Sequence, residues 1–247
     1  MLAIISAMQE EIALIVHSLT AVQTHEFGRR QFHVGQLHGE EVVAGFSRWG
    51  KVAAAATVTQ LLAAFPVSRI VLSGVAGAVR PGLAIGDIVV ASGLIQHDLD
   101  ARPIFPRYEI PLLSKAILEP DPALGERLRS AASQFLAHDL AAAVPAGARE
   151  FFRMSAPQVH TGLIGSGDKF FASALEVREL AARLPDLLCV EMEGAAVAQV
   201  CHEYGIPFGV VRTISDSADE NAGHYFPRFL SEIARHYSAG ILARFMH

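Results

Sequence analysis

The stretch Cys189–Asp219, CVEMEGAAVAQVCHEYGIPFGVVRTISDSAD, decides the fold of this chain. Its pattern predicts a short buried strand, a helix over residues 194–204 and a second buried strand. The segment Gly205–Pro207 ends the helix and starts the second strand. Because strands alternate with helices in this way in the α/β class, the stretch predicts an α/β fold.

Charged residues in this stretch occur where its strands give way to helix or loop. They are Glu191, Glu193, Arg212 and Asp216. Open α/β sheets bind ligands in the crevice outside the carboxyl ends of their strands, so charge at these ends predicts a site. The alternative is that these acids are solvated loop charges. We favour a site because two charged clusters converge from adjacent strands.

The composition favours one large domain over residues 1–247, since no Pro/Gly/Ser linker divides the chain. A hydrophobic share of 51% predicts a sheet covered on both faces and an apolar subunit interface. No apolar run is long enough to span a bilayer. Glu10 and Glu11 interrupt the first apolar stretch, so we expect neither a membrane segment nor a signal peptide.

The cysteines and the charge pattern predict a cytoplasmic protein. Cys189 and Cys201 lie in apolar segments and are expected to be reduced core residues. The net charge of -5 is spread along the chain, without a basic stripe or interleaved aromatic residues. We therefore expect no nucleic-acid partner and no membrane partner.

The first half of the chain predicts further strands and helices. The expected elements are a strand over 2–7, a helix to about residue 19, a hairpin of 30–36 with 40–47, and an Ala-rich helix over 52–64. Glu11 falls in the first turn of the first helix, where a crevice at the strand end would lie. Acids at such positions often only complement the helix dipole, which explains Glu10 well.

Two small-residue segments follow predicted strands. The strand that begins at Arg69 runs into an expected loop, GVAG at 74–77, which brings backbone close to a ligand or a neighbouring strand. This segment lacks the pattern of a P-loop or a dinucleotide fingerprint. The strand over 159–164 ends at 165–171, GSGDKFF, a glycine-rich loop with two aromatic residues that suits a flat ring.

The remaining segments carry weaker signals. A strand over 88–95 leads to His97-Asp98-Leu99-Asp100, but one such motif without further ligands predicts no metal site. The other expected elements are an aromatic-bearing loop over 103–111, a helix over 121–136, an irregular connection over 137–157 with a helical turn at 149–153, and a structural helix over 226–243.

Motifs along nearly the whole chain resemble the 5'-methylthioadenosine/S-adenosylhomocysteine nucleosidases of the nucleoside phosphorylase family. They are AMQEE (7–11), WGKVAAA (49–55), GVAG (74–77), GDIVV (86–90), SGDKF (166–170), VEMEGAA (190–196) and VVRTISDSAD (210–219). The resemblance implies a single α/β domain around a mixed, partly closed sheet flanked by helices. It also implies a homodimer, no cofactor, and a loop at 103–111 that completes the partner's site.

The resemblance implies hydrolysis of the N-glycosidic bond of 5'-substituted adenine nucleosides to adenine and a free sugar. The expected substrates are 5'-methylthioadenosine and 5'-deoxyadenosine, with S-adenosylhomocysteine as a further candidate. Because this reaction builds positive charge on the ribose and negative charge on the purine, one site must stabilise both. By resemblance, Asp216 protonates the purine and Glu11 deprotonates the attacking water. Glu193 binds the ribose hydroxyls, and Arg212 orients the acids and the water.

The resemblance also assigns residues to the substrate pocket. Phe170 would stack on adenine, Met192 would pack under the ribose, and backbone groups near Phe171 would contact the purine edge. The other assigned residues are Trp49, Val75, Ala76, Gly77, Phe105, Glu191, Ser215 and Phe226.

This sequence departs from the family pattern at three places. Val75 replaces a usual serine, Trp49 replaces a smaller aliphatic residue, and the loop 98–111 lacks the usual aromatic motif. Since Trp49 would lie near the 5' substituent, it predicts a preference for small apolar 5' groups.

Three alternative functions stay open at this stage. The first is a phosphate-dependent purine nucleoside phosphorylase, in which Arg29, Arg30 or Arg48 would bind the phosphate. The second is a nucleosidase for futalosine-like substrates. The third is a catalytically silent nucleoside-binding protein of the same fold, although the chain contains all the expected acids.

Overall fold

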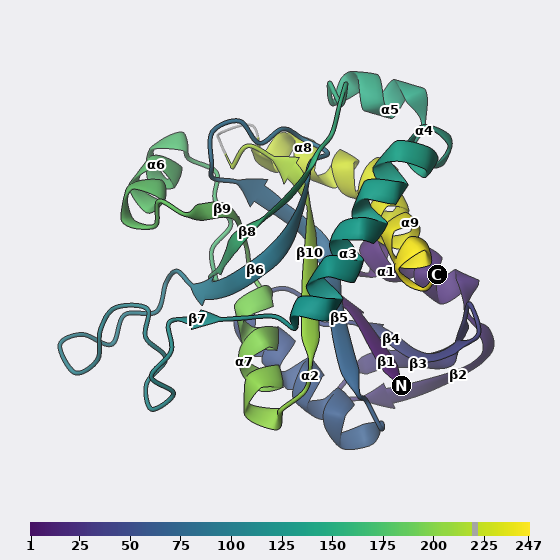
Figure 1. The fold of residues 1–247 in the computed structure, drawn as a ribbon, viewed down its shortest axis with the longest axis horizontal. Helices are drawn as coiled ribbons and strands as arrows, with labels where there is room; N and C mark the ends of the chain where they lie inside the picture. Colours follow the sequence, from purple (N-terminus) through teal and green to yellow (C-terminus); the bar gives the residue numbers. More distant parts are fainter. Residues whose placement is uncertain (219–221) are drawn as a thin grey trace.

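The computed structural model describes residues 1–218 and 222–247, so Asp219 of the quoted stretch lies outside the described residues. In this part of the chain, ten strands form one sheet with helices packed around it (Figure 1). The strands are β1 Leu2–Ser6, β2 Thr20–Phe27, β3 Arg30–Leu37, β4 Glu40–Phe46, β5 Arg69–Ala78, β6 Ile88–Gln96, β7 Ile117–Leu118, β8 Val159–Ser166, β9 Leu187–Glu191 and β10 Phe208–Asp216.

The sheet is mixed and partly closed. Its order is β10-β6-β8-β9-β5-β1-β4-β3-β2, and β10 also pairs with β5, so five of these strands close on themselves. Within the closed part, β5 pairs parallel with β10 and antiparallel with β9, while β10 pairs antiparallel with β6. The predicted α/β class with a mixed, partly closed sheet is therefore confirmed.

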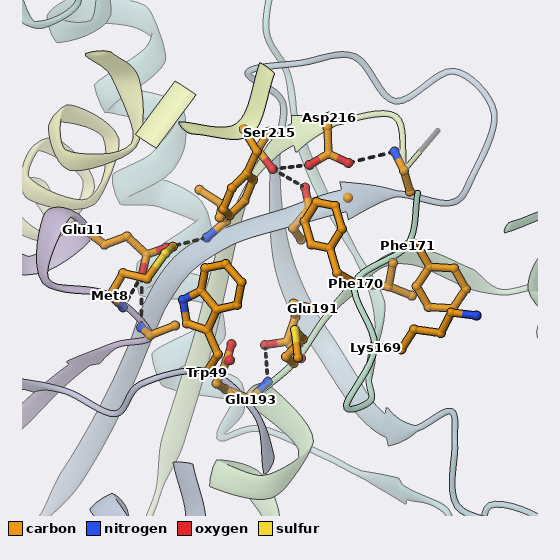
Figure 2. A pocket seen from close by; sticks show the side chains of 18 residues that line it. Met8, Glu11, Trp49, Lys169, Phe170, Phe171, Glu191, Glu193, Ser215 and Asp216 are labelled. Carbon is orange, nitrogen blue, oxygen red and sulfur yellow. Dashed lines mark hydrogen bonds between the residues drawn. The ribbon is translucent and has the colours of Figure 1, made fainter. Parts of the chain in front are cut away.

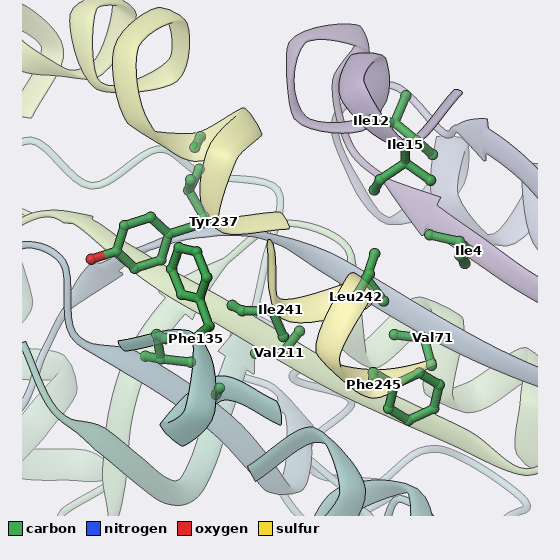
Figure 3. Close-up of a cluster of buried hydrophobic side chains, with 14 of the residues drawn as sticks. Ile4, Ile12, Ile15, Val71, Phe135, Val211, Tyr237, Ile241, Leu242 and Phe245 are labelled. Atoms are coloured by element: carbon green, nitrogen blue, oxygen red, sulfur yellow. The ribbon is translucent and has the colours of Figure 1, made fainter. Parts of the chain in front are cut away.

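Helices cover the sheet on more than one side (Figure 1). They are α1 Gln9–Ser18, α2 Lys51–Ala64, α3 Pro122–Gln134, α4 Leu140–Ala143, α5 Ala146–Phe151, α6 Ala174–Arg183, α7 Gly194–Tyr204, α8 Ala222–Phe229 and α9 Arg235–Phe245, with π-helical turns η1 Phe135–Asp139 and η2 Leu230–Ala234. On one side, α1, α3, η1 and α9 bury apolar side chains against the sheet, among them Phe135, Tyr237 and Ile241 (Figure 3). A second core cluster lies under α2 and α7.

The predicted helix over 194–204 and the strands on both sides of it are present. Gly205 ends α7 in the left-handed conformation, with a φ of 67°, which explains why the sequence signal for this end was clear. Every residue of β10 is buried, as expected for a strand covered on both faces. No helix in residues 1–218 and 222–247 has the length and apolarity to cross a membrane.

Three local predictions were wrong. The segment 74–77 is part of β5 and not a loop, because its glycines pair in register with β10. Arg212 lies in the middle of β10, directly opposite Gly74, and not at a strand end. The chain is helical over 137–143 where an irregular connection was expected, because apolar Phe135 and Leu140 continue the buried face of α3.

Candidate active site

A pocket opens beside the C-terminal ends of β5, β9 and β10 and the start of α1 (Figure 2). β5 and β10 run parallel and end together, and the end of β9 pairs antiparallel with the end of β5, which explains why segments far apart in sequence meet here. The lining residues are Ala7, Met8, Glu11, Trp49, Val75, Ala76, Gly77, Lys169, Phe170, Phe171, Val190, Glu191, Met192, Glu193, Ser215, Asp216, Ala218 and Phe226.

Most of the residues that the sequence assigned to a site line this pocket, and two do not. Arg212 lies behind the lining, where its guanidinium contacts Glu191 and Glu193. Phe105 lies on the loop between β6 and β7, which extends away from the sheet at the left of Figure 1. We call Glu11, Glu191, Glu193, Arg212 and Asp216 the floor of the site and Trp49, Phe170 and Phe226 its rim.

Sequence reasoning missed several lining residues. They are Ala7, Met8, Lys169, Val190 and Ala218. Four of them are small or apolar residues next to strand ends, where a sequence alone cannot distinguish a pocket wall from a core position. Lys169 could have been found from the sequence, because it lies within the glycine-rich loop 165–171, directly before Phe170.

Glu11 is a fully buried carboxylate held by backbone donors. Its Oε2 accepts hydrogen bonds from the backbone N–H groups of Ala7 at 3.0 Å and Met8 at 2.9 Å. Its Oε1 accepts one from the N–H of Val75 at 3.0 Å. Since each carboxylate oxygen has about two acceptor sites, Oε1 keeps one free for a ligand. Burial raises the pKa of Glu11 to about 7, against the lowering effect of Arg212 and the backbone donors.

Arg212 is the buried cation of the floor. Its Nη2 donates to Glu191 Oε2 and lies 3.5 Å from Glu193 Oε2. Glu191 is also held by the hydroxyl of Ser166 and the backbone N–H of Gly194. These contacts compensate the Arg212 charge inside the protein, as a buried charge requires.

Glu193 lies at the N-cap position of α7 and lines the pocket. Its Oε1 accepts the backbone N–H of Gly50 at 2.9 Å. Burial and the nearby charge of Glu191 raise the pKa of Glu193 to about 8, although Arg212 opposes the shift. The floor thus contains two carboxyl groups that change protonation near neutral pH, which is typical of sites that move protons.

Glycines in β5 make room for the charged side chains of the floor. A Cβ at Gly74 would lie 2.1 Å from Arg212 Nη1 and 2.8 Å from Glu11 Oε1. A Cβ at Gly77 would lie 3.0 Å from Asp216 Oδ1. The segment 74–77 therefore has the close backbone approach that its small residues predicted, inside a strand and toward side chains of the site.

Asp216 ends β10 on another side of the pocket. The hydroxyl of Ser215 donates to its Oδ2 at 2.6 Å, and the backbone N–H of Ala218 donates to its Oδ1 at 2.8 Å. The residue is only 4% exposed, so its carboxyl group is fixed in one orientation within the pocket. A fixed carboxyl at this place can exchange a proton with a bound ligand.

The rim is aromatic and more open than the floor. The Trp49 and Phe226 rings pack edge to face at 5.9 Å between centroids, and Phe226 packs on Phe170 in the same way at 5.5 Å. Trp49 is 51% exposed and Phe170 is 38% exposed. Figure 2 shows the Trp49 indole between Glu11 and Phe170 in that view. Such rings offer a flat apolar surface to a ligand.

The possible metal ligands in segment 97–100 contact other protein side chains. His97 is buried with its ring against Phe171, and Asp98 forms an ion pair with Lys51. Asp100 pairs with Arg102 near the surface. In the part of the chain that the structure describes, no group of three or more His, Cys, Asp or Glu residues is arranged to hold a metal ion.

The family model of the phosphorylase superfamily matches residues 1–247. A curated relative, the 5'-methylthioadenosine/S-adenosylhomocysteine nucleosidase of Chromohalobacter salexigens, is 36% identical over 95% of this chain and 92% of its own length. This chain belongs to the phosphorylase superfamily. Within that superfamily it belongs with the 5'-methylthioadenosine/S-adenosylhomocysteine nucleosidases, as the sequence motifs predicted.

Solved structures of the family share this fold. The Neisseria meningitidis 5'-methylthioadenosine/S-adenosylhomocysteine nucleosidase in complex with methylthio-immucillin-A matches with a TM-score of 0.86 and 33% identity, over 99% of this chain and 97% of that one. A futalosine hydrolase of Helicobacter pylori matches with a TM-score of 0.82 and 31% identity, over 98% and 96%. The family therefore includes solved relatives named for different nucleosides.

Proposed function

We propose that this protein is an N-glycosyl hydrolase that converts 5'-substituted adenine nucleosides to adenine and a free sugar. The observation that carries the proposal is the buried Glu11 carboxylate, which shares one pocket with Asp216. A nucleosidase needs a base for the water and an acid for the leaving purine, and these two groups supply both.

Glu11 is the general base in this proposal. Its Oε1 retains an acceptor site, and a pKa of about 7 lets it take a proton from water near neutral pH. The Nη1 of Arg212 has no hydrogen-bond partner in the described part of the chain. A Cβ at Gly74 would lie 2.1 Å from this Nη1 and 2.8 Å from Glu11 Oε1, so Arg212 lies close enough to Glu11 to orient its carboxyl group.

The remaining floor and rim residues bind the nucleoside. Asp216 protonates the departing purine, and Phe170 packs on its ring. Glu193 hydrogen-bonds the ribose hydroxyls and, in its ionised form, stabilises the positive charge that develops on the sugar. We call the part of the pocket with Phe170 and Asp216 the base side and the part with Trp49 and Glu193 the sugar side.

The 5' substituent lies against Trp49 in this arrangement, which favours small apolar groups such as methylthio or deoxy. Val75 contributes its backbone N–H to Glu11 and an apolar side chain to the lining. The adenine nucleosides of the proposal are therefore 5'-methylthioadenosine and 5'-deoxyadenosine, with S-adenosylhomocysteine disfavoured by the indole.

Phosphorolysis is less well supported than hydrolysis. Arg29, Arg30 and Arg48 are absent from the residues that line the pocket in the described part of the chain. The floor there contains Glu11, Glu191 and Glu193 around the single cation Arg212. Arg212 already pairs with Glu191 and Glu193, and each carboxyl group of the floor that is ionised would repel a phosphate dianion in this low-dielectric crevice, at a cost of several kcal/mol.

A homodimer completes the proposal. Ile104 and Leu112, on the loop between β6 and β7, are 82% and 88% exposed, and Phe105 lies between them without lining the pocket of its own chain. We propose that this loop reaches the site of a second subunit. Sedimentation at assay concentration should show a dimer, and Phe105→Ala should impair the handling of the 5' group more than that of adenine. A fully active monomer would exclude this arrangement.

The hydrolase proposal is tested by product analysis. The protein is incubated with 5'-methylthioadenosine, S-adenosylhomocysteine, 5'-deoxyadenosine and aminofutalosine, with and without phosphate. Release of adenine and free sugar from the first and third compounds, unchanged by phosphate, is expected. A Glu11→Gln/Asp216→Asn double variant purified in the same way controls for contaminating nucleosidases. Base release only from aminofutalosine, or no release at all, would contradict the proposal.

A further inference from the structure

A group of charged and polar side chains outside the floor joins three segments beside the pocket. The segments are the turn 48–51, the residues 96–98 at and after the end of β6, and the loop 167–171. Lys51 starts α2, and its Nζ donates to Asp98 Oδ1 at 2.6 Å and to Gln96 Oε1 at 3.1 Å. The Lys51 side chain is 18% exposed, so these bonds are partly shielded from water.

The same group closes into a ring of contacts. Asp98 Oδ2 accepts the backbone N–H of Asp168 at 3.0 Å, and Asp168 Oδ1 accepts the backbone N–H of Lys51 at 2.8 Å. The Lys51 ammonium thus anchors Asp98, Asp98 holds the backbone of Asp168, and the Asp168 carboxylate returns to the backbone N–H of Lys51. We call Lys51, Asp98 and Asp168 the clamp.

Gly50 lets the clamp close. It has a φ of +93°, and a Cβ there would lie 2.9 Å from Asp168 Oδ1. Any side chain would therefore strain the backbone and push Asp168 away from Lys51. The N–H of Gly50 donates to Glu193 at 2.9 Å, so the turn that the clamp holds also orients a carboxylate of the floor.

The two ends of the clamp carry opposite parts of the rim. Trp49 precedes Gly50 on the turn, and Phe170 follows Asp168 on the loop. Their rings lie on Phe226 at 5.9 and 5.5 Å. The distance between the turn and the loop therefore sets the spacing of the Trp49 ring on the sugar side and the Phe170 ring on the base side.

We propose that Lys51 is a positioning residue that fixes the spacing of the two sides of the pocket through Asp98 and Asp168. The inference rests on the proposed function, because it assumes that one nucleoside spans both sides. A ligand that spans both sides depends on their spacing, whereas adenine alone contacts only the base side. Small displacements of positioning groups are known to weaken catalysis by up to about 10²-fold.

The alternative is that the clamp only contributes to stability, as surface ion pairs do to a small extent. The chain offers a matched comparison in Arg129, which pairs with Glu126 within α3 and has a 50% exposed side chain. Arg129→Met removes a cation and an ion pair that are outside the pocket lining. Lys51→Met removes a cation of the same charge from the clamp.

The test compares Lys51→Met, Lys51→Arg and Arg129→Met with the wild type. The measured quantities are kcat and KM for 5'-methylthioadenosine and the inhibition constant of adenine. We expect Lys51→Met to raise KM about tenfold while the adenine constant changes less than about threefold, since only the nucleoside spans both sides. Lys51→Arg should restore most of the nucleoside affinity, and Arg129→Met should change neither constant.

Two results would overturn the inference: an unchanged KM in Lys51→Met, or equal weakening of nucleoside and adenine. Asp98→Asn provides a second variant if Lys51→Met does not fold, and the same selective rise in KM is expected. Failure of the proposed function is separate, because the wild type would then release no adenine. In that case, the fluorescence of the single tryptophan is titrated with 5'-methylthioadenosine and with adenine, which gives the affinity for each ligand. Equal weakening of both affinities in Lys51→Met would overturn the inference.

Discussion

At the floor of the pocket, Glu11 and Arg212 are 0% and 1% exposed, whereas Trp49 and Phe170 at its rim are 51% and 38% exposed. The floor side chains lie on or beside strands of the closed sheet and are held by backbone donors and ion pairs. The rim rings are carried by a turn, a loop and α8, and they contact mainly one another. This difference indicates that the sheet holds the reacting side chains in place, while the aromatic rings of the rim determine which substrate binds.

Replacement of Glu11 by Gln breaks the floor most directly. The amide cannot accept the proton of the attacking water, so kcat should fall by about 10²–10⁴-fold, as is typical for loss of a general base. Single-turnover release of adenine measures this change. Glu10→Gln is the matched control, since Glu10 is exposed and outside the lining, and it should stay near wild-type activity. A fall of less than about fivefold in Glu11→Gln would show that Glu11 is not the base.

Asp216→Asn separates acid catalysis from binding within the floor. The amide can still hydrogen-bond the purine but cannot protonate it, so the chemical step should slow by about 10²-fold while adenine inhibition changes little. Glu193→Gln is the comparison variant and should weaken both KM and kcat through lost ribose contacts. Equal small effects from the two variants would argue against both roles.

Trp49→Ile changes the rim and leaves the floor intact. Removal of the indole should raise kcat/KM for S-adenosylhomocysteine relative to 5'-methylthioadenosine by about ten- to a hundredfold, because one such contact is worth ~1–3 kcal/mol. The inhibition constant of adenine, which should not change, is the control. An unaltered ratio of the two substrates would mean that the rim does not select the 5' group.

The raised pKa of Glu11 predicts a small effect on stability with a defined sign. Its folded pKa of about 7 exceeds the ordinary value of 4.5, so the folded state binds more protons between these values. The stability that this group contributes is complete below about pH 4.5 and is lost as pH rises through about 7. The Tm difference between Glu11→Gln and the wild type should therefore shift in favour of the variant, by a few degrees, when the pH is raised from 5 to 8. An equal Tm difference between variant and wild type at pH 5 and pH 8 would contradict the raised pKa of Glu11.

The parts of the fold that the sequence predicted well have local signals. The helix over 194–204 ends at a glycine and a proline, and the strands beside it are continuously apolar. The edge strand β2 Thr20–Phe27 was not predicted, because most of its residues are exposed and the apolar pattern of a buried strand is missing. Its hydrogen-bonded neighbour in the sheet is β3. The helix α6 Ala174–Arg183 was not predicted either.

The site was predictable to the extent that charge marks strand ends. Glu191 and Asp216 end β9 and β10, and a sequence pattern can show this. The place of Arg212 in mid-strand depends on Gly74 in the neighbouring strand, which gives its guanidinium room. Contacts of this kind, like that of Lys51 with Asp98, form only when distant segments pack together, so no local pattern reveals them.

The fate of the solvent oxygen tests the central claim, that the buried carboxylates of the floor direct water to the sugar. The wild type is incubated with 5'-methylthioadenosine in H₂¹⁸O with added phosphate, and the sugar product is analysed by mass spectrometry. Our account predicts free sugar with one ¹⁸O atom at the anomeric carbon and no sugar phosphate. Unlabelled sugar 1-phosphate as the main product would contradict it, because phosphate would then be the nucleophile at the floor.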